Sequence, residues 1–249
     1  LGGLPFQRHP VPLLIDGVAE VHRALFLSLD QVEDQQTRAL YFRDYMSASF
    51  LLDHKERAGL APQAQRVVRG KADYLRLLRG WMFDADGIEG AVMKRWVESR
   101  FGLIPRSHKG PIHSAEEPRY LAYQADYVRG LYNANALEAQ LDLLYCFCQY
   151  ELHRRLPGAT HWRLYRGVNQ LRRHDVLDHT TEGEAVVLLN NLNSFTSDRH
   201  RSCTFGDTIL STDVPLAKLL FWYDLLPGVL QGEQEFLVIG GVYQVGVSR

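Results

Sequence analysis

Cysteine is scarce in this chain of 249 residues, which contains Cys146, Cys148 and Cys203. An odd and small number does not form the disulfide framework of a small secreted protein. The first two cysteines form C-x-C within a predicted helix, where residues two apart point about 200° apart and do not readily share a metal ion. We therefore expect no disulfide framework, no metal site and a reducing, cytoplasmic location.

An excess of one charge sign is also missing, since 28 basic residues stand against 29 acidic ones. Proteins that bind nucleic acids usually carry a basic excess or stripe, so DNA and RNA are not expected as partners. No segment approaches the roughly 18 consecutive apolar residues of a membrane span. The first residues lack a basic region followed by an apolar run, so no signal peptide is expected.

The two common glycine-rich nucleotide motifs are absent, because the sequence contains neither G-x-G-x-x-G nor G-x-x-x-x-G-K-[ST]. If a nucleotide binds, neither a Rossmann fold nor a P-loop holds it. The composition itself is ordinary for a globular protein, with 46% hydrophobic and 23% charged residues. This length and composition favour one large domain or two small ones.

The periodicity of the apolar residues changes near residue 157. Before this point, apolar residues at helical spacing predict helices over about 16–28, 33–53, 61–83, 88–101 and 119–156. After it, runs rich in Val, Ile, Phe and Tyr predict strands over 162–167, 185–189, 208–214, 219–223, 236–239 and 242–247. No long helix separates these strands, as a parallel sheet would require. We predict an α+β fold, in which a helical lobe (1–156) and a mainly antiparallel β lobe (157–249) form one integrated domain.

Three segments of the β lobe carry residues that bind or orient charged groups. Arg166 and Gly167 end an apolar strand, where a guanidinium can bind phosphate or carboxylate oxygens in pairs. The segment 193–198 places hydroxyls around one aromatic residue, and these can orient a carboxylate or cap a following helix. Glu233 and Glu235, two residues apart in extended chain, lie on the same side. Each segment alone is more often a solvated strand end or a helix cap than a site.

In this order, the arginine, the Ser/Thr segment and the E-x-E pair resemble the R-S-E signature of arginine-specific ADP-ribosyltransferases. Segments over most of the chain are similar to the dinitrogenase reductase ADP-ribosyltransferase family, namely 74–103, 141–152, 164–169, 190–199, 205–210, 224–228 and 235–241. The resemblance implies a β-sandwich core with the helical lobe packed on it, and NAD as co-substrate. It implies transfer of ADP-ribose to an arginine of the nitrogenase iron protein, with a PII-type signalling protein as activator.

The resemblance also implies roles for single residues. Glu235 would stabilise the positive charge that develops as nicotinamide leaves the ribose, and Ser197 would orient Glu235. Glu233 would bind the acceptor guanidinium and accept its proton, because a protonated arginine is a poor nucleophile. Arg166 would bind the pyrophosphate. The full set expected to contact NAD is Arg166, Gly167, Phe195, Thr196 and Ser197.

Two positions depart from the family pattern. The usual Ser-Thr-Ser run reads Ser197-Asp198-Arg199, and Leu230 stands where many relatives have an aromatic residue. Three alternatives stay open: an NAD glycohydrolase, a catalytically silent interaction module on the same fold, and a helical scaffold that binds no nucleotide. Glu233 argues against the hydrolase, since water as acceptor would not need that carboxylate.

Other conspicuous residues are assigned to structure. Trp81, Met82 and Phe83 lie in a predicted helix and are expected in the core, with a recognition surface for the target protein as the alternative. Cys203 is expected to be buried. His108 is expected in a solvated loop.

Substitution of the two glutamates separates their roles. Glu235→Gln should abolish NAD cleavage and protein transfer together, because the charge beside the reacting ribose carbon is lost. Glu233→Gln should lose transfer to arginine but keep some NAD hydrolysis. Nicotinamide release and labelled protein are measured on the same samples. A Glu233→Gln protein that modifies arginine at the wild-type rate contradicts this division.

Overall fold

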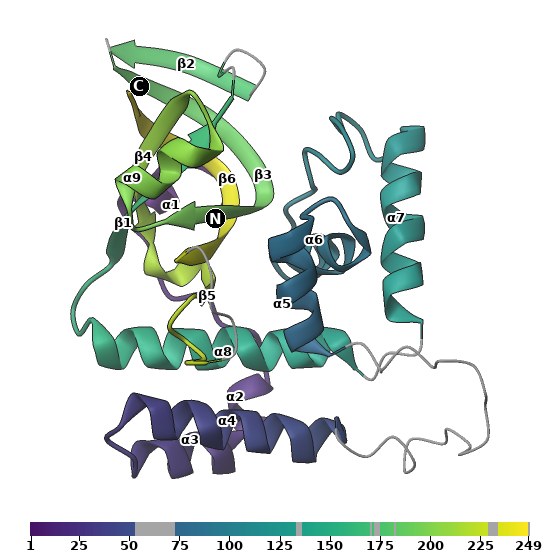
Figure 1. Cartoon of the computed structure of the whole chain (residues 1–249), viewed down its shortest axis with the longest axis vertical. Helices are drawn as coiled ribbons and strands as arrows, with labels where there is room; N and C mark the ends of the chain where they lie inside the picture. The colour runs from purple at the N-terminus through teal and green to yellow at the C-terminus, as the bar shows by residue number, and fades with distance from the viewer. Residues whose placement is uncertain are drawn as a thin grey trace.

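The computed structural model describes residues 1–52, 73–132, 136–169, 171, 175–181, 183–228 and 234–248. Helices occupy the first part of the chain and strands the second (Figure 1). The last long helix ends at Arg155 and the first strand begins at His161, close to the predicted change of pattern. The predicted combination of helices with an antiparallel sheet is therefore confirmed.

Before the strands, the described helices follow the predicted pattern, except that the first short helix was not predicted and two predicted helices are each divided in two. They are α1 (Leu4–Arg8), α2 (Val18–Val21), α3 (Arg23–Asp30), α4 (Gln35–Phe50), α5 (Tyr74–Phe83), α6 (Ile88–Phe101), α7 (Pro118–Leu131) and α8 (Leu137–Arg155). The first predicted helix is two short ones, α2 and α3. The long helix expected over 119–156 is also two, because Tyr132 leaves the helical conformation at the end of α7. Of the helix expected over 61–83, residues 61–72 lie outside the described part of the chain.

Helix α5 presents a continuous buried stripe. Tyr74, Leu77, Leu78 and Trp81 are buried and recur at helical spacing, so one face of α5 packs into the core. The side chain of Asp73 caps the helix by accepting from the Arg76 amide at 2.7 Å. This stripe places Trp81 in the last turn of α5, on the side that faces the strands.

The strands are β1 (His161–Val168), β2 (Asp175–Thr181), β3 (Glu184–Thr196), β4 (Thr208–Pro215), β5 (Leu219–Trp222) and β6 (Glu235–Ser248). All of their pairings are antiparallel. Strand β2 was not predicted. The strands predicted over 236–239 and 242–247 are one long strand, β6, so the Gly240-Gly241 pair between them is not a hairpin turn.

The strand pairings close on themselves. Strand β3 pairs with β1, β1 with β4, β4 with β6, and β6 again with β3, while β2 and β5 extend the sheet at β3 and β6. The expected sandwich of two sheets is thus replaced by a closed ring of strands. The long strands β3 and β6 make this possible, because a register shift between Leu189 and Leu192 bends their ladder.

One hydrophobic core runs through the helical and the β-rich parts. Figure 1 shows α8 between the strands and the α3–α4 pair, and Gln149 of α8 donates to the Leu219 carbonyl of β5 at 2.8 Å. The N-terminal segment joins the strands as well. The side-chain amide of Gln7 in α1 donates to the Thr212 hydroxyl at 2.8 Å. The backbone carbonyl of Gly2 accepts from the backbone amide of Val242 at 2.8 Å. A division of the chain at residue 156 therefore stays a prediction.

The β3–β6 bulge joins the strands to the helical part. At this bulge the side chain of Asn191 donates to the carbonyl of Lys94 in α6 at 2.8 Å and to that of Leu103, two residues after the end of α6, at 3.0 Å. The opposite residue, Gly240, lies so close to β3 that a Cβ there would stand 1.6 Å from the Asn190 carbonyl oxygen. Only glycine allows this approach of the two backbones.

We expect Gly240→Ala to lower the free energy of unfolding by about 3 kcal/mol, because the added methyl group forces the two strands apart. Gly3→Ala is the matched control, since its Cβ would meet Pro5 at an ordinary 3.5 Å. The control should change stability by less than about 0.5 kcal/mol. Urea unfolding measures both. Equal losses of stability in the two variants would show that the close approach of Gly240 to Asn190 does not constrain the fold.

Candidate active site

Three strands converge where the candidate site residues lie. Tyr165 of β1 pairs with Thr196 of β3, and Thr196 pairs in turn with Glu235 of β6. Glu235 is therefore one of three residues aligned across neighbouring strands, and Arg166 directly follows another of them, Tyr165. The strand order thus brings together the arginine, the Ser/Thr segment and the glutamate of the sequence pattern.

The carboxylate of Glu235 receives two donors on one oxygen. The Ser194 hydroxyl donates to Glu235 Oε1. The indole Nε1 of Trp81 donates both to Ser194 Oγ at 2.9 Å and to Glu235 Oε1 at 3.2 Å. Donors to a carboxylate favour its ionised form and fix its direction. This carboxylate is therefore held by both halves of the chain.

Ser194 contacts Glu235 in the structure, and the role expected for Ser197 stays a prediction. Strand alternation places Ser194 on the same side as Thr196, the residue paired with Glu235. Ser197 is three residues after Ser194, an odd number, and it lies one residue past the end of β3. Its neighbour Asp198 caps α9 (Arg199–Ser202) by accepting from the His200 amide at 2.8 Å, which is the other role the sequence allowed for this segment.

Arg166 lies beside Glu235 with its guanidinium fixed. Its Nη1 donates to the Ser194 carbonyl at 2.6 Å, and its guanidinium lies 6.0 Å from the centre of the Phe195 ring. Loss of water around the guanidinium lowers the pKa of Arg166, and the Glu235 charge opposes this shift. Because the ordinary pKa of arginine lies above ~12, Arg166 stays a cation. It can offer paired donors to an anion in the cleft.

Gly167 has a packing role in addition to its place at the site. A Cβ there would lie 2.1 Å from the Ser202 carbonyl oxygen of α9. The glycine therefore allows α9 to approach β1 and close this side of the cavity.

Two adjoining cavities meet at these residues. The smaller, of about 320 Å³, is lined by four of the five residues expected to contact NAD and by Glu235. The larger, of about 760 Å³, shares Trp81, Ala85, Arg166 and Ser194 with it. Together they form one cleft between the helical part and the strands, large enough for an extended ligand.

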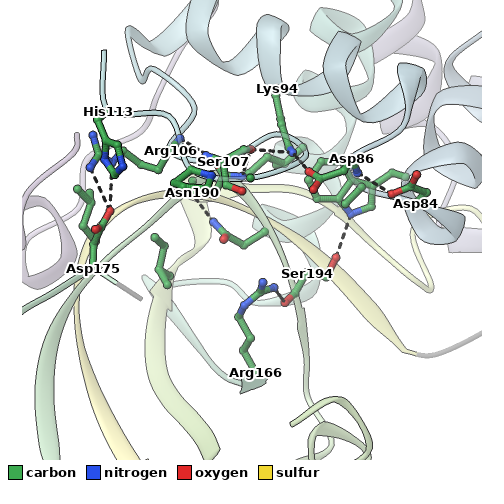
Figure 2. Close-up of a pocket in the computed structure, with 18 residues that line it drawn as sticks. Asp84, Asp86, Lys94, Arg106, Ser107, His113, Arg166, Asp175, Asn190 and Ser194 are labelled. Carbon is green, nitrogen blue, oxygen red and sulfur yellow. Dashed lines mark hydrogen bonds and ion pairs between the residues drawn. The ribbon is translucent and has the colours of Figure 1, made fainter. Parts of the chain in front are cut away.

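The larger cavity has charged walls (Figure 2). Lys94 of α6 is buried, and its Nζ donates to Asp86 at 2.7 Å and to the Ser107 carbonyl at 3.0 Å. Burial lowers the pKa of Lys94, and Asp86 partly reverses the shift. Arg106 pairs with Asp175 of β2 at 3.1 Å across the cleft. The walls of the larger cavity thus carry both charge signs, with Lys94 and Arg106 paired to aspartates and Arg166 beside them.

Some expected site residues cannot be placed. Glu233 and Leu230 lie outside the described residues. Within the described ranges, no group of three or more His, Cys, Asp or Glu side chains is placed to hold a metal ion. None of the helices described here has the length and apolar character to cross a membrane.

Several assignments of single residues need correction. Phe83 was expected in the core but is 95% exposed, because it falls off the buried stripe of α5. His108 was expected in solvent but is 1% exposed and lies 3.2 Å from Asp126. Cys203 is exposed rather than buried. Trp81 is buried as expected, but its contact with Glu235 was missed.

We expect Ser194→Ala to lower the rate of NAD cleavage about 10- to 100-fold, because a hydrogen bond to a charged group contributes roughly 1.5–3 kcal/mol. Ser197→Ala is the matched control and should stay within about twofold of the wild type. Nicotinamide release at saturating NAD measures both. A larger loss of NAD cleavage in Ser197→Ala than in Ser194→Ala would show that Ser197 orients Glu235, as the sequence predicted.

Comparison with known proteins identifies the family of this chain. The model of the family described as dinitrogenase reductase ADP-ribosyltransferase (DRAT) matches residues 1–247. The NAD(+)–dinitrogen-reductase ADP-D-ribosyltransferase of Rhodospirillum rubrum is 43% identical over 245 residues, which cover 98% of this chain and 89% of that protein. No solved structure matches the chain. This protein belongs to the dinitrogenase reductase ADP-ribosyltransferase family.

Proposed function

We propose that this protein is an NAD-dependent mono-ADP-ribosyltransferase that modifies an arginine of the nitrogenase iron protein, inactivates it and so regulates nitrogen fixation. One structural observation carries the proposal: Glu235 is held by Ser194 and Trp81 in the same cleft as Arg166. The R. rubrum relative, which is named for ADP-ribosyl transfer to dinitrogen reductase, supports the substrate.

NAD is proposed to lie along the cleft. Arg166 binds the pyrophosphate with its paired donors, and the nicotinamide ribose lies in the smaller cavity beside Glu235. Phe195 and Thr196 line this part. The larger cavity, which contains Lys94, has room for the adenosine half.

The proposed reaction is a substitution at the ribose carbon. The bond to nicotinamide breaks with its electron pair leaving on nicotinamide, and the ribose carbon gains positive charge. The ionised Glu235 stabilises that charge. A guanidinium nitrogen of the acceptor then bonds to the same carbon and loses its proton. We assign this proton to Glu233, on the sequence pattern alone.

Two alternatives lead to different products. An NAD glycohydrolase would use the same cleft with water as acceptor. A silent interaction module would keep the fold without turnover, but the hydrogen bonds that hold Glu235 and Arg166 favour a working site. The resemblance to the family also supports a PII-type activator, and the small, odd number of cysteines supports a cytoplasmic location; we include both in the proposal.

The direct test incubates the protein with labelled NAD, purified nitrogenase iron protein, ADP and a PII-type protein. We expect label on the iron protein, and loss of that label with Glu235→Gln. Nicotinamide release without label on protein would favour the glycohydrolase. Absence of both, with NAD still bound in calorimetry, would favour the silent module.

A further inference from the structure

Trp81 belongs to the helical part and donates a hydrogen bond to the carboxylate of Glu235. An indole N–H donates but never accepts, so Ser194 Oγ must accept from Trp81. The hydroxyl proton of Ser194 is then directed to Glu235 Oε1. Trp81 therefore acts on Glu235 twice, by its own hydrogen bond and by orienting the Ser194 hydroxyl.

The helix that carries Trp81 is fixed by contacts with two other helices. The Tyr74 amide at its start donates to Gln140 of α8 at 2.9 Å. Arg76 pairs with Glu89 of α6 at 3.1 Å. Gly80 lies so close to α6 that a Cβ would stand 2.5 Å from the Glu89 side chain. The position of Trp81 is thus set by its contacts with α6 and α8.

We infer that Trp81 is a positioning residue for the catalytic carboxylate: its indole N–H fixes Glu235 Oε1, so that the helical part completes the site built by the strands. The inference rests on the proposed function. The competing role is core filling, since Trp81 is 3% exposed and belongs to the buried stripe of α5. Loss of the N–H with retention of an aromatic ring distinguishes the two roles.

The test compares Trp81→Phe with Trp96→Phe. Trp96 of α6 is also buried, and its Nε1 donates to Asp142 at 2.7 Å, so the control loses an equivalent hydrogen bond away from the cleft. The kcat of NAD cleavage, the KM for NAD and the pH profile of kcat are measured for both variants. Thermal unfolding confirms that each is folded.

Trp81→Phe should lower kcat about 10- to 100-fold, with KM for NAD changed less than about threefold. The acid limb of the pH profile should move to higher pH, because a carboxylate that loses a donor is more easily protonated. Trp96→Phe should leave that limb in place. A Trp81→Phe protein with the wild-type kcat and acid limb, or one that changes only KM, would overturn the inference.

Two further measurements protect the test. If Trp81→Phe does not fold, replacement of Trp81 by benzothienylalanine keeps the bicyclic shape and substitutes sulfur for the N–H, with the same expected losses. In a double-mutant cycle, Trp81→Phe and Ser194→Ala should lose less together than the product of their separate losses, because both act on one oxygen. Independent losses would contradict the inference. The role of Trp81 is judged by the ratio of the kcat of NAD cleavage between variant and wild type. The proposed function is tested separately, by transfer of ADP-ribose from the wild-type protein to the iron protein.

Discussion

The register between β3 and β6 is the constraint on which the site depends. These strands pair from Glu184 opposite Gly246 to Thr196 opposite Glu235, with one bulge between. A shift of one residue would turn Ser194 to the other side of the strand and remove its hydrogen bond to Glu235. The close approach of Gly240 to Asn190 fixes the bulge, and the bulge in turn binds α6 through Asn191. The same feature therefore closes the ring of strands and attaches the helical part to it.

The cleft forms where the helical part is attached to the ring of strands. Its walls come from two parts of the chain that share one core, and each wall carries a cation, the buried Lys94 or the half-buried Arg166. Removal of water lowers the pKa of both groups, and Asp86 and Glu235 oppose the shifts. Under the proposed function, the pyrophosphate of NAD lies against the guanidinium of Arg166.

Much of this fold could be predicted from the sequence, because the change from helical to strand periodicity is strong. The limits are physical. A Gly-Gly pair permits either a turn or a bulge, so Gly240-Gly241 did not reveal that β6 is continuous. Strand β2 carries too many polar residues to stand out. Ring closure depends on pairings between distant strands, which local pattern does not specify.

The sequence likewise indicated some residues of the site and not others. Arg166 and Glu235 could be placed because they stand at strand ends. The choice between Ser194 and Ser197 depends on the register with a strand forty residues away, which the sequence does not give. For Trp81 one signal existed: a buried indole N–H requires an acceptor, so a tryptophan at the end of an apolar stripe indicates a polar group nearby. That acceptor could be identified only once the helix was packed on the strands.

The most direct measurement is a crystal structure of the protein with an NAD analogue whose nicotinamide–ribose bond cannot break. We predict that a ribose hydroxyl lies within hydrogen-bond distance of Glu235, that Trp81 still donates to that carboxylate, and that the pyrophosphate contacts Arg166. An analogue bound with its ribose away from Glu235, or its pyrophosphate away from Arg166, would contradict it.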